Sequence, residues 1–559
     1  MAAIDTRLGG SSSARGARDA TTSVRLDLPM RSDEPMRVIV IGGGVAGLVA
    51  ARACAIGGAD VVILESGSDC GGSVARADVA GLALDAAAES FATRGGTVER
   101  LLAELDLTSR IEWPNAAGAW LRLADRTVPM PKGGLLGIPI DPLADDVVAA
   151  IGPDAARRAQ RDLDEPAVGV TVDDSRTLGA LVRERMGDAV LDRLVAPVVT
   201  GIYATDPDEL DLDAIAPGLR EAFAGTGSLA RAVRRLRQSG GPGSPTPKTA
   251  TTDRASVPAA AAVRPGSAAG GLRGGMWTLV DALLADLRAR GVLLEASTAA
   301  TALTVRADGS WDVAVAARPA PRQGILGETQ DDTTGLTENP LSQRSDAREG
   351  TLRADAVIVA TDGPTAMRLL ASGGDAASLA VLRGIAWPEP VRVDLATLVL
   401  DASALDAAPR GTGLLVADDA DSADDAVAAK ALTHSTAKWS WLAETAGDGR
   451  HVVRLSYGRP GAPNPAAALD DAQLRERALR DASALLGVPL SADQVAGFAR
   501  RTWLYPRSLA AAGQAARVRA VRQAVTATPG LEVTGAWVAG TGLASVIPDA
   551  QDAATRALR

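Results

Sequence analysis

An α/β fold is predicted by three neighbouring features near the start of the chain. Residues 37–41, RVIVI, form a short run of β-favouring apolar side chains, which is typical of a buried strand. A glycine-rich segment follows, and then an alanine-rich stretch to about Gly57 that predicts a helix. Residues 61–64, VVIL, predict a second buried strand. This strand–helix–strand order predicts a Rossmann-like domain.

The glycine-rich segment between the first strand and the helix has the spacing G-x-G-x-x-G. Gly42 permits the tight turn, Gly44 lets a pyrophosphate approach the backbone, and Gly47 lets helix and strand pack closely. The N-terminus of the helix offers free N–H groups and the positive end of its dipole to the phosphates. The predicted cofactor-binding residues of this turn are Gly42, Gly43, Gly44, Val45, Ala46 and Gly47.

Glu65 ends the second predicted strand, about 20 residues beyond the glycines. A carboxylate at this place can accept hydrogen bonds from both ribose hydroxyls, and it disfavours a 2′-phosphate. A glycine motif framed by strand, helix, strand and terminal acid is a strong signal, whereas the glycines alone are a weak one. We therefore expect an adenine dinucleotide that is not NADP.

A second glycine-rich loop, residues 66–73, follows Glu65 directly. In flavoproteins of the glutathione-reductase-like class, a glycine pair here lets the chain pass close to the diphosphate and ribityl groups. This favours permanently held FAD over transiently held NAD, the alternative being an ordinary surface turn. The predicted cofactor-binding residues of this loop are Ser66, Gly71, Gly72 and Ser73.

Length and composition restrict the class of protein. A chain of 559 residues is expected to form two or three domains. The net charge of −10 gives a nucleic-acid partner no electrostatic support. Cys54 and Cys70 are the only cysteines, which favours a reduced, cytoplasmic setting and excludes a zinc site. His434 and His451 are the only histidines, and we expect both to be structural and no metal to be bound.

The sequence offers no membrane span or secretory signal. It has no apolar run of about 18 residues, and its first 35 residues, rich in Ser, Arg, Ala and Asp, lack an apolar core region and predict a disordered tail. Peripheral attachment to a membrane through an apolar helical surface stays open.

The chain beyond the second glycine loop alternates short elements. Residues 79–85 predict a hairpin strand that leads into the block AAAESF at 86–91. Residues 97–107 space their apolar side chains as one helix face. Five prolines between residues 114 and 142 exclude a long helix there.

Several of these blocks together resemble the protoporphyrinogen/coproporphyrinogen oxidase family, the FAD-dependent enzymes of haem biosynthesis. They are GGGVAGL at 42–48, LE at 64–65, AAESFATR at 87–94 and VPMPKGGLLGIP at 128–139. The likeness continues through residues 176–212, 274–287, 354–361, 433–441 and 535–550, and covers roughly four-fifths of the chain. AAESFATR and MPKGGLLGIP are specific to this family, whereas the glycine motif and ADAVIVAT at 354–361 are shared with amine oxidases and carotene desaturases.

The resemblance implies an oxygen-dependent oxidation of a porphyrinogen to a porphyrin, in which FAD accepts hydride and O₂ is reduced to H₂O₂. The alanine- and arginine-rich composition suits a high-GC Gram-positive bacterium, in which the family acts on coproporphyrinogen III. The implied partners are the porphyrinogen and O₂, and a hand-off to ferrochelatase and peripheral membrane contact stay open.

The resemblance also assigns residues around the cofactor and the substrate. Arg94 and Tyr203 are implied to bind the substrate, Arg94 through its carboxylates. The alternatives are an ion pair of Arg94 with Glu99 or Glu104, and ordinary core packing of Tyr203. Ala300 and Ala360 are expected at two further strand ends. The additional implied cofactor-binding residues are Ala87, Ala88, Glu89, Ser90, Ala300, Ala360, Thr541, Gly542 and Leu543. No catalytic side chain is assigned.

The domains implied by the resemblance are discontinuous. A helical subdomain is expected at 144–237, and flexible insertions at 238–271 and 318–350. The substrate-binding domain, built on a mixed sheet, is expected at 111–143 and 376–514. The FAD-binding domain is expected at 36–110, 272–375 and 515–559, after the tail at 1–35.

Other functions remain open at this point. An amine oxidase or desaturase could use the same scaffold, and protoporphyrinogen IX could replace coproporphyrinogen III as substrate. A non-catalytic flavin- or porphyrin-binding protein is a further alternative. Asp69, where the family usually has an Arg, and Ala87, where it usually has a Gly, would favour that alternative, because both could weaken FAD binding.

Overall fold

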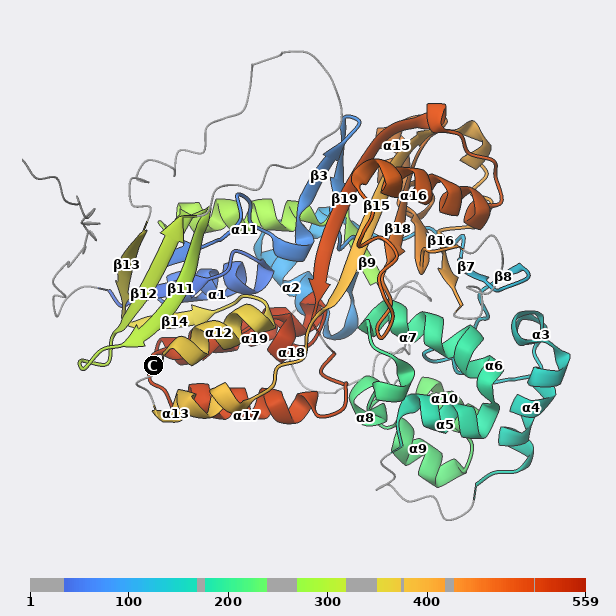
Figure 1. Ribbon diagram of the computed structural model, residues 1–559, viewed down its shortest axis with the longest axis horizontal. Coiled ribbons are helices and arrows are strands. Elements are labelled where there is room, and N and C mark those ends of the chain that lie inside the picture. The colour runs from blue at the N-terminus through green and yellow to red at the C-terminus, as the bar shows by residue number, and fades with distance from the viewer. Residues whose placement is uncertain are drawn as a thin grey trace, which may run out of the picture.

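A computed structural model describes residues 35–167, 176–238, 269–317, 349–373, 377–417, 427–506 and 508–559. Figure 1 shows two sheet-containing units side by side and a helical subdomain below the second one. The predicted tail and most of both predicted insertions lie outside the described residues.

The first unit is built on a five-stranded parallel sheet with the order β10-β2-β1-β14-β20. Its strands are β1 (Arg37–Ile41), β2 (Asp60–Leu64), β10 (Leu293–Glu295), β14 (Ala356–Val359) and β20 (Leu531–Val533). Strands from the start, middle and end of the chain thus lie next to one another. The glycine turn follows the central strand β1, so it lies at the carboxyl edge of the sheet, where open α/β sheets bind ligands.

Helices cover both faces of this sheet. Successive residues of β1 point to opposite sides, and because those from Val38 to Ile41 are all apolar, both faces have to be buried. Val38 and Val40 pack against α1 (Val45–Ile56), α11 (Trp277–Ala289) and α19 (Leu543–Ala557). Ile39 and Ile41 pack against α12 (Gly363–Ser372), α17 (Gln514–Thr526) and a three-stranded antiparallel sheet. The strands of that smaller sheet are β11 (Thr298–Val305), β12 (Trp311–Ala317) and β13 (Glu349–Ala354).

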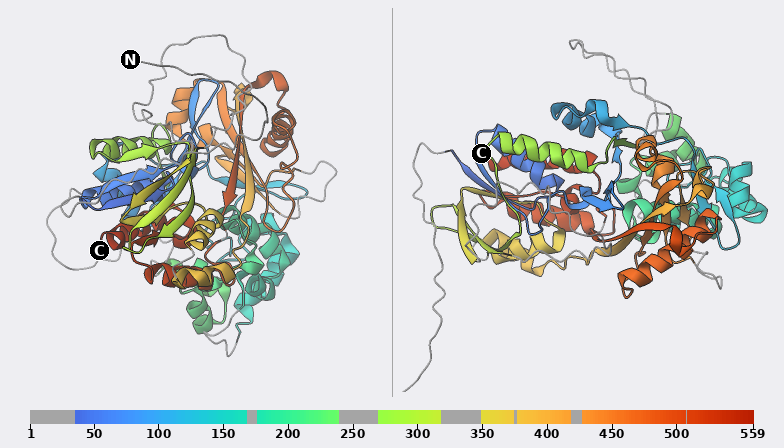
Figure 2. Two further views of the ribbon diagram at one scale, coloured as in Figure 1. Left: turned by 60° about the vertical axis from the view of Figure 1, so that its left-hand side comes forward. Right: turned by 90° about the horizontal axis from the view of Figure 1, so that it is seen from above.

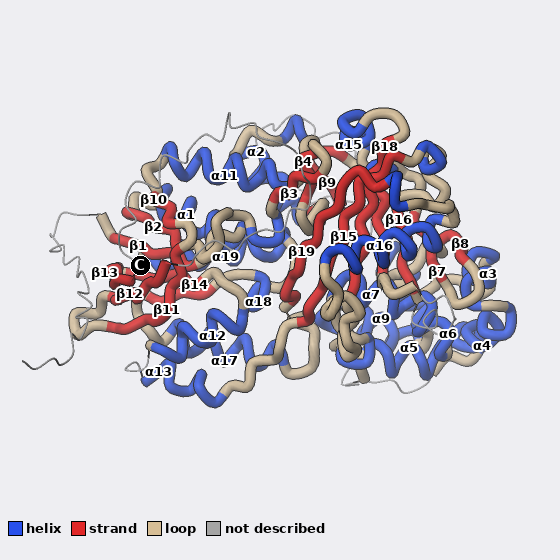
Figure 3. Tube along the Cα trace, turned by 45° about the horizontal axis from the view of Figure 1, so that its top comes forward, coloured by secondary structure: helices blue, strands red, loops and turns tan. Residues whose placement is uncertain are grey.

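The second unit is a mixed seven-stranded sheet with the order β19-β15-β18-β17-β16-β7-β8. Its strands are β7 (Ala119–Arg122), β8 (Thr127–Pro129), β15 (Val391–Asp401), β16 (Gly413–Val416), β17 (Ala431–His434), β18 (Arg450–Tyr457) and β19 (Val495–Tyr505). Short helices α14 (Ser435–Lys438) and α15 (Ser440–Ala446) connect β17 to β18. Figure 3 shows β19 between the two units, next to α18 (Ala536–Ala539) of the first.

The two faces of the seven-stranded sheet differ in what covers them. We call the outer face the one on which Leu398, Val453 and Leu455 pack, fully buried, against α16 (Asp471–Leu486). The inner face carries the alternate residues, including Thr397 and its cross-strand partner Arg454. It is turned toward the hairpin β3 (Arg76–Val79) and β4 (Leu82–Asp85), which belongs to the first unit in sequence.

The helical subdomain forms a separate core around Leu181, Val199 and Phe223. Figure 2 shows it set to one side of both sheets. Its helices are α3 (Asp145–Ile151), α4 (Pro153–Asp164), α5 (Leu178–Met186), α6 (Asp188–Val190), α7 (Ala196–Tyr203), α8 (Leu212–Ile215), α9 (Leu219–Thr226) and α10 (Leu229–Gln238).

The predicted strand–helix–strand unit and the hairpin at 79–85 are confirmed. The helix predicted at 97–107 is α2 (Thr97–Glu104), and residues 114–142 form short strands and turns in place of a long helix. Two boundaries of the predicted insertions were wrong. Strand β9 (Ala269–Leu272) pairs with β5 (Phe91–Ala92) and β6 (Ile111–Glu112), and β13 begins at 349, because both strands find distant partners that local composition does not reveal.

Both histidines lie on the outer face of the seven-stranded sheet. His434 Nε2 and His451 Nδ1 are 3.1 Å apart, and His451 Nε2 is 2.9 Å from Asp406 Oδ1. The side chain of His434 is fully buried, and burial together with the charge of His451 lowers the pKa of His434 to about 4. This arrangement agrees with the expected structural role.

The buried His434 predicts a loss of stability at mildly acidic pH. Between pH 6.5 and about 4 the unfolded chain protonates this histidine and the folded chain does not, so the unfolded state binds more protons. The free energy of unfolding should therefore fall as the pH is lowered, by up to about 1.4 kcal/mol per pH unit from this residue. Urea unfolding of wild type and His434→Gln at several pH values isolates the effect. The variant should show a shallower slope, and equal slopes would contradict the prediction.

Within the described ranges, no helix is both long and apolar enough to cross a membrane. The same residues contain no group of three or more His, Cys, Asp or Glu side chains placed to hold a metal ion.

Candidate dinucleotide and substrate site

The glycine turn is packed so tightly that only glycine fits at two of its positions. A Cβ at Gly47 would lie 1.9 Å from the carbonyl oxygen of Gly42. Gly42 has a φ of +113°, and a Cβ there would lie 2.5 Å from the carbonyl oxygen of Ala360. Ala360 directly follows β14, at the strand end where it was expected, and it contacts the turn. The roles predicted for Gly42 and Gly47 follow from these contacts.

Gly44 is different, because a Cβ at this residue would meet no atom of the described residues within 4 Å. It is the N-cap of α1, whose first turn carries no capping side chain and no acidic residue. The turn that includes Val45 and Ala46 therefore offers unshared N–H groups to open space. This is the environment that a diphosphate requires.

Glu65 is held in place beside the turn by the backbone. Its Oε2 accepts a hydrogen bond from the Gly43 N–H at 2.7 Å, and its Oε1 accepts one from the Gly67 N–H at 2.6 Å. Each carboxylate oxygen keeps a further lone pair, so the pair of oxygens can still accept from ribose hydroxyls. Ser66 is exposed next to it.

The second glycine loop lies against the first. Gly71 forms a parallel bridge with Gly44, and its N–H donates to the carbonyl oxygen of Gly43 at 2.9 Å. Gly72 would bring a Cβ within 3.4 Å of the Gly44 Cα. The structure thus brings the two predicted glycine loops together around one open space. Ser73 begins the connection to the hairpin, and its carbonyl oxygen accepts from the Ala88 N–H.

Neither cysteine should react readily although Cys70 borders this loop. Burial raises the pKa of each thiol to about 12, and the carboxylates of Glu65 and Asp69 add to the shift at Cys70. Because the thiolate is the nucleophile, we expect iodoacetamide at pH 8 to leave the folded protein unmodified. Intact-mass measurement, with urea-unfolded protein as the control, checks this. Rapid labelling of the folded protein at Cys70 would contradict it.

A second helix N-terminus is available for an anionic group. Helix α19 begins at Leu543 with Gly542 as N-cap, and neither a capping side chain nor an acidic residue occupies its first turn. Thr541 immediately precedes this cap. The positive end of the dipole would stabilise negative charge placed there.

Ala300, in contrast, was wrongly expected at a strand end. It is the third residue of β11 and is buried against the sheet, because β11 begins earlier, at Thr298, beside Glu65.

The block Ala87–Ser90 connects the hairpin of the first unit to the inner face of the second. Ala87, Ala88 and Ser90 are partly exposed, and Glu89 is nearly buried, with 11% of its side chain exposed. Glu89 forms ion pairs with Lys438 at 2.5 Å and with Arg454 at 2.8 Å. Burial opposes ionisation, but the two cations outweigh it and hold the pKa of Glu89 below its usual value.

Asp85 lies beside this cluster at the end of β4. Burial raises the pKa of Asp85 to about 6, although the Trp277 N–H donates a hydrogen bond to it at 3.1 Å. Asp85, Glu89 and Arg454 share a cavity of about 20 Å³. A polar cavity of this size has room for about one water molecule. Sequence reasoning missed Asp85, Lys438 and Arg454, because nothing local marks three residues so far apart as neighbours.

Arg94 and Tyr203 lie in different units, but near enough for the charge of Arg94 to act on the pKa of the Tyr203 hydroxyl. Tyr203 ends α7, and burial raises its pKa while the positive charge of Arg94 lowers it in part. In the described chain Arg94 forms no ion pair with Glu99 or Glu104; Glu104 pairs with Arg52 instead. Arg94 is exposed and remains available to a ligand.

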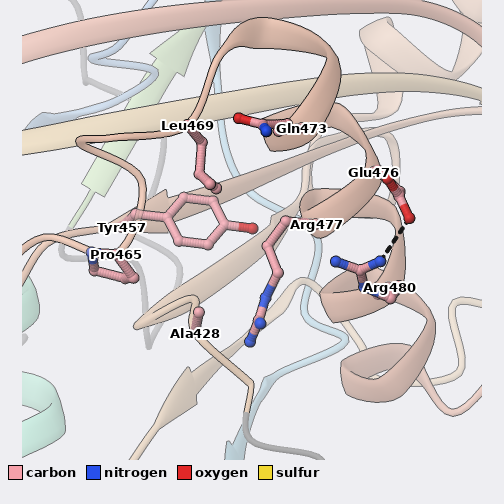
Figure 4. Close-up of a pocket in the computed structure, with 8 residues that line it drawn as sticks. All are labelled: Ala428, Tyr457, Pro465, Leu469, Gln473, Glu476, Arg477 and Arg480. Carbon is pink, nitrogen blue, oxygen red and sulfur yellow. Dashed lines mark hydrogen bonds and ion pairs between the residues drawn. The ribbon is translucent and has the colours of Figure 1, made fainter.

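A larger pocket, of about 280 Å³, lies on the other side of the seven-stranded sheet and does not belong to this site. Figure 4 shows Tyr457, Gln473 and Arg477 around it, with the ion pair between Glu476 and Arg480 at its edge. Its polar groups are occupied by one another: the Tyr457 hydroxyl donates to Asp481, and Arg477 pairs with the same carboxylate.

Residues 40–105 match the profile of the NAD(P)-binding Rossmann-like domain family. Together with the glycine turn and Glu65, this match shows a Rossmann-like domain at the start of the chain. Its full-length similarity is more specific. The chain is 28% identical over 535 residues to the coproporphyrinogen III oxidase of Mycobacterium tuberculosis, which covers 93% of this chain and 97% of the relative. The resemblance to the protoporphyrinogen/coproporphyrinogen oxidases is thereby confirmed.

Solved structures share the fold over nearly the whole chain. A crystal structure from Exiguobacterium, provisionally named protoporphyrinogen oxidase, has a TM-score of 0.71 at 22% identity and covers 94% of this chain and 99% of that one. Cyclohexylamine oxidase from Brevibacterium oxydans has a TM-score of 0.55 at 15% identity with the same coverage. The predicted α/β architecture, with its Rossmann-like domain, mixed sheet and helices, is confirmed.

Proposed function

We propose that this protein is an FAD-dependent oxidase that converts coproporphyrinogen III to coproporphyrin III, reduces O₂ and releases H₂O₂. The observation that carries the proposal is the similarity to coproporphyrinogen III oxidases along 93% of the chain. The open space beside Gly44 at the uncapped N-terminus of α1, with Glu65 held next to the same turn, fits the binding of FAD.

Each chain segment then has a role in the reaction. When bound, FAD supplies the hydride acceptor and is reoxidised by O₂. The turn Gly42–Gly47 and the N-terminus of α1 bind the diphosphate, and Glu65 binds the ribose. The residues at the second glycine loop, at Ala87–Ser90 and at Thr541–Leu543 would hold the flavin end, where the positive end of the α19 dipole would favour negative charge. Arg94 pairs with a substrate carboxylate and Tyr203 packs against the macrocycle.

The test is to mix the purified protein anaerobically with coproporphyrinogen III, then admit air and record flavin absorbance, porphyrin fluorescence and H₂O₂. The proposal expects the yellow flavin to bleach and then fluorescent coproporphyrin to appear, with one H₂O₂ for each O₂ consumed. Repeating the experiment with protoporphyrinogen IX compares the two substrates. A yellow protein that leaves both tetrapyrroles unchanged would overturn the proposal in favour of an amine oxidase or desaturase. A colourless protein would instead indicate the binding role that Asp69 and Ala87 favour.

Peripheral contact with the cytoplasmic face of a membrane, and from there transfer of the product to ferrochelatase, form part of the proposal. The large apolar side chains of Leu143, just before the helical subdomain, and of Ile202, within it, are 48% and 50% exposed and support it. Flotation with phospholipid vesicles should carry the protein upward, and Ile202→Ser should reduce the bound fraction.

A further inference from the structure

The inner face of the seven-stranded sheet carries a set of side chains that the proposed function has not used. Residues directly paired across strands point to the same side, so the registers place Arg501 with Leu395 and Ser456, and Trp503 with Val393. Arg454, which contacts Glu89, lies on the same face. This face is therefore continuous with the charged cluster at the flavin end of the site.

Both ends of this face are closed by other parts of the protein. At one end, a Cβ on Gly497 would lie 2.9 Å from the Cβ of Ala80 in the β3–β4 hairpin. At the other, a Cβ on Gly201 of α7 would lie 3.7 Å from the Leu415 side chain. Between these closures Leu395, Ser456 and Arg501 remain partly exposed, whereas their neighbours on the outer face, such as Ala396 and Leu455, are fully buried. Figures 1 and 3 both show β19 at this place, between α18 and α7.

Two adjacent arginines on β19 have opposite surroundings. Arg500 points to the outer face, where it donates to the buried carboxylate of Asp394 and to two backbone carbonyl oxygens. Arg501 points to the inner face and forms no hydrogen bond or ion pair with any part of the chain that the structure describes. A partly buried guanidinium without a partner loses hydration and gains nothing in return, unless a ligand supplies the anion.

Further unpartnered donors accompany Arg501 on the same strand. The Trp503 Nε1–H is buried and has no acceptor in the described structure. Tyr505, the next residue on this face, lies within the electrostatic reach of Arg454 and its hydroxyl makes no hydrogen bond to the described residues. Alternate residues of a strand are about 7 Å apart, so these donors form one row. A row of donors that contains a guanidinium and two aromatic rings suits a carboxylate on an aromatic or pyrrolic ring system.

We infer that Arg501, with the Trp503 Nε1–H beside it, forms a second carboxylate subsite, separate from Arg94, that makes the site selective for coproporphyrinogen over protoporphyrinogen. The inference rests on the proposed function. Coproporphyrinogen carries a propionate on every pyrrole ring, whereas protoporphyrinogen has vinyl groups in place of two of them. A vinyl group opposite Arg501 leaves the guanidinium unpaired, and a site built to pair a charged group strongly rejects an analogue that lacks it.

The experiment compares Arg501→Gln, Arg501→Lys and a matched control, Arg475→Gln, in the flavin-loaded enzyme. Arg475 is an exposed arginine on α16, so its replacement changes the net charge equally on the opposite side of the sheet. Binding of coproporphyrin III and of protoporphyrin IX is measured by quenching of porphyrin fluorescence, together with kcat and KM for both porphyrinogens. Flavin absorbance monitors the fold.

We expect Arg501→Gln to weaken coproporphyrin III binding and raise the KM for coproporphyrinogen by about tenfold to a hundredfold, with little change in kcat. Protoporphyrin IX binding should change less than threefold, Arg501→Lys should be intermediate, and Arg475→Gln should match wild type. Trp503→Phe, which keeps the ring and removes the donor, should give a smaller loss in the same direction. This second variant keeps the test decisive if Arg501→Gln does not fold.

The inference would be overturned if Arg501→Gln weakened the binding of both porphyrins equally. It would also be overturned if neither Arg501→Gln nor Trp503→Phe weakened the binding of coproporphyrin III. Failure of the proposed function would look different. In that case the wild-type protein itself would oxidise neither porphyrinogen.

Discussion

Gly47→Ala should prevent stable folding of the nucleotide-binding unit. Gly44→Ala should leave the fold intact and weaken only the binding of the cofactor. A methyl group at Gly47 would lie 1.9 Å from the Gly42 carbonyl oxygen, a contact that forces β1 and α1 apart. Overpacking usually costs about 1–3 kcal/mol, and this clash between helix α1 and the backbone of the turn should cost about 3 kcal/mol or more, because no flexible side chain can move aside. A methyl group at Gly44 would meet no atom within 4 Å in the part of the chain that the structure describes, and the φ of −70° at Gly44 is one that alanine adopts freely.

The two variants form a matched pair, because each adds one methyl group to the same turn. Urea unfolding of the flavin-free proteins should show a large loss of stability for Gly47→Ala and a change below about 0.5 kcal/mol for Gly44→Ala. Titration with FAD should show at least a tenfold weaker affinity for Gly44→Ala, because the methyl group occupies the space of the diphosphate. Equal behaviour of the two variants would contradict this account of the turn.

Glu89→Gln should be the most damaging change at the junction between the two sheets. The substitution leaves Lys438 and Arg454 facing each other around a neutral amide, in a site where 11% or less of the Glu89 and Arg454 side chains is exposed. Removing one partner of a buried ion pair costs about 3–5 kcal/mol, because the remaining charges are desolvated and unpaired. Urea unfolding of the flavin-loaded protein measures the loss.

A double variant separates this charge effect from simple loss of packing. Adding Lys438→Met to Glu89→Gln removes one of the two unpaired cations, so it should restore at least a third of the lost stability. Lys438→Met alone should cost less than Glu89→Gln, because Glu89 keeps Arg454 as its partner. If the double variant is no more stable than Glu89→Gln, the two cations do not account for the loss.

Local sequence was sufficient to predict the nucleotide-binding turn. The strand at 37–41, the glycine spacing and Glu65 lie within 30 residues of one another, and each has a physical requirement that few residue types meet. The structure packs Gly42 and Gly47 tightly, leaves open space at Gly44 and holds Glu65 beside the same turn, as the pattern indicates. In contrast, the prediction that Ala300 ends a strand was wrong, because strand boundaries depend on pairing partners as well as on composition.

The sequence by itself determined the fold class, the dinucleotide turn and the resemblance to porphyrinogen oxidases. Only the tertiary structure decided how the second half of the site is built. Glu89, Lys438 and Arg454 come from three separate segments, and Arg501 differs from Arg500 only in the face of β19 that it occupies. The reason is that a strand alternates its two faces residue by residue. Which face becomes a binding surface depends on the helix or hairpin that covers the other, and those elements lie far away in the chain.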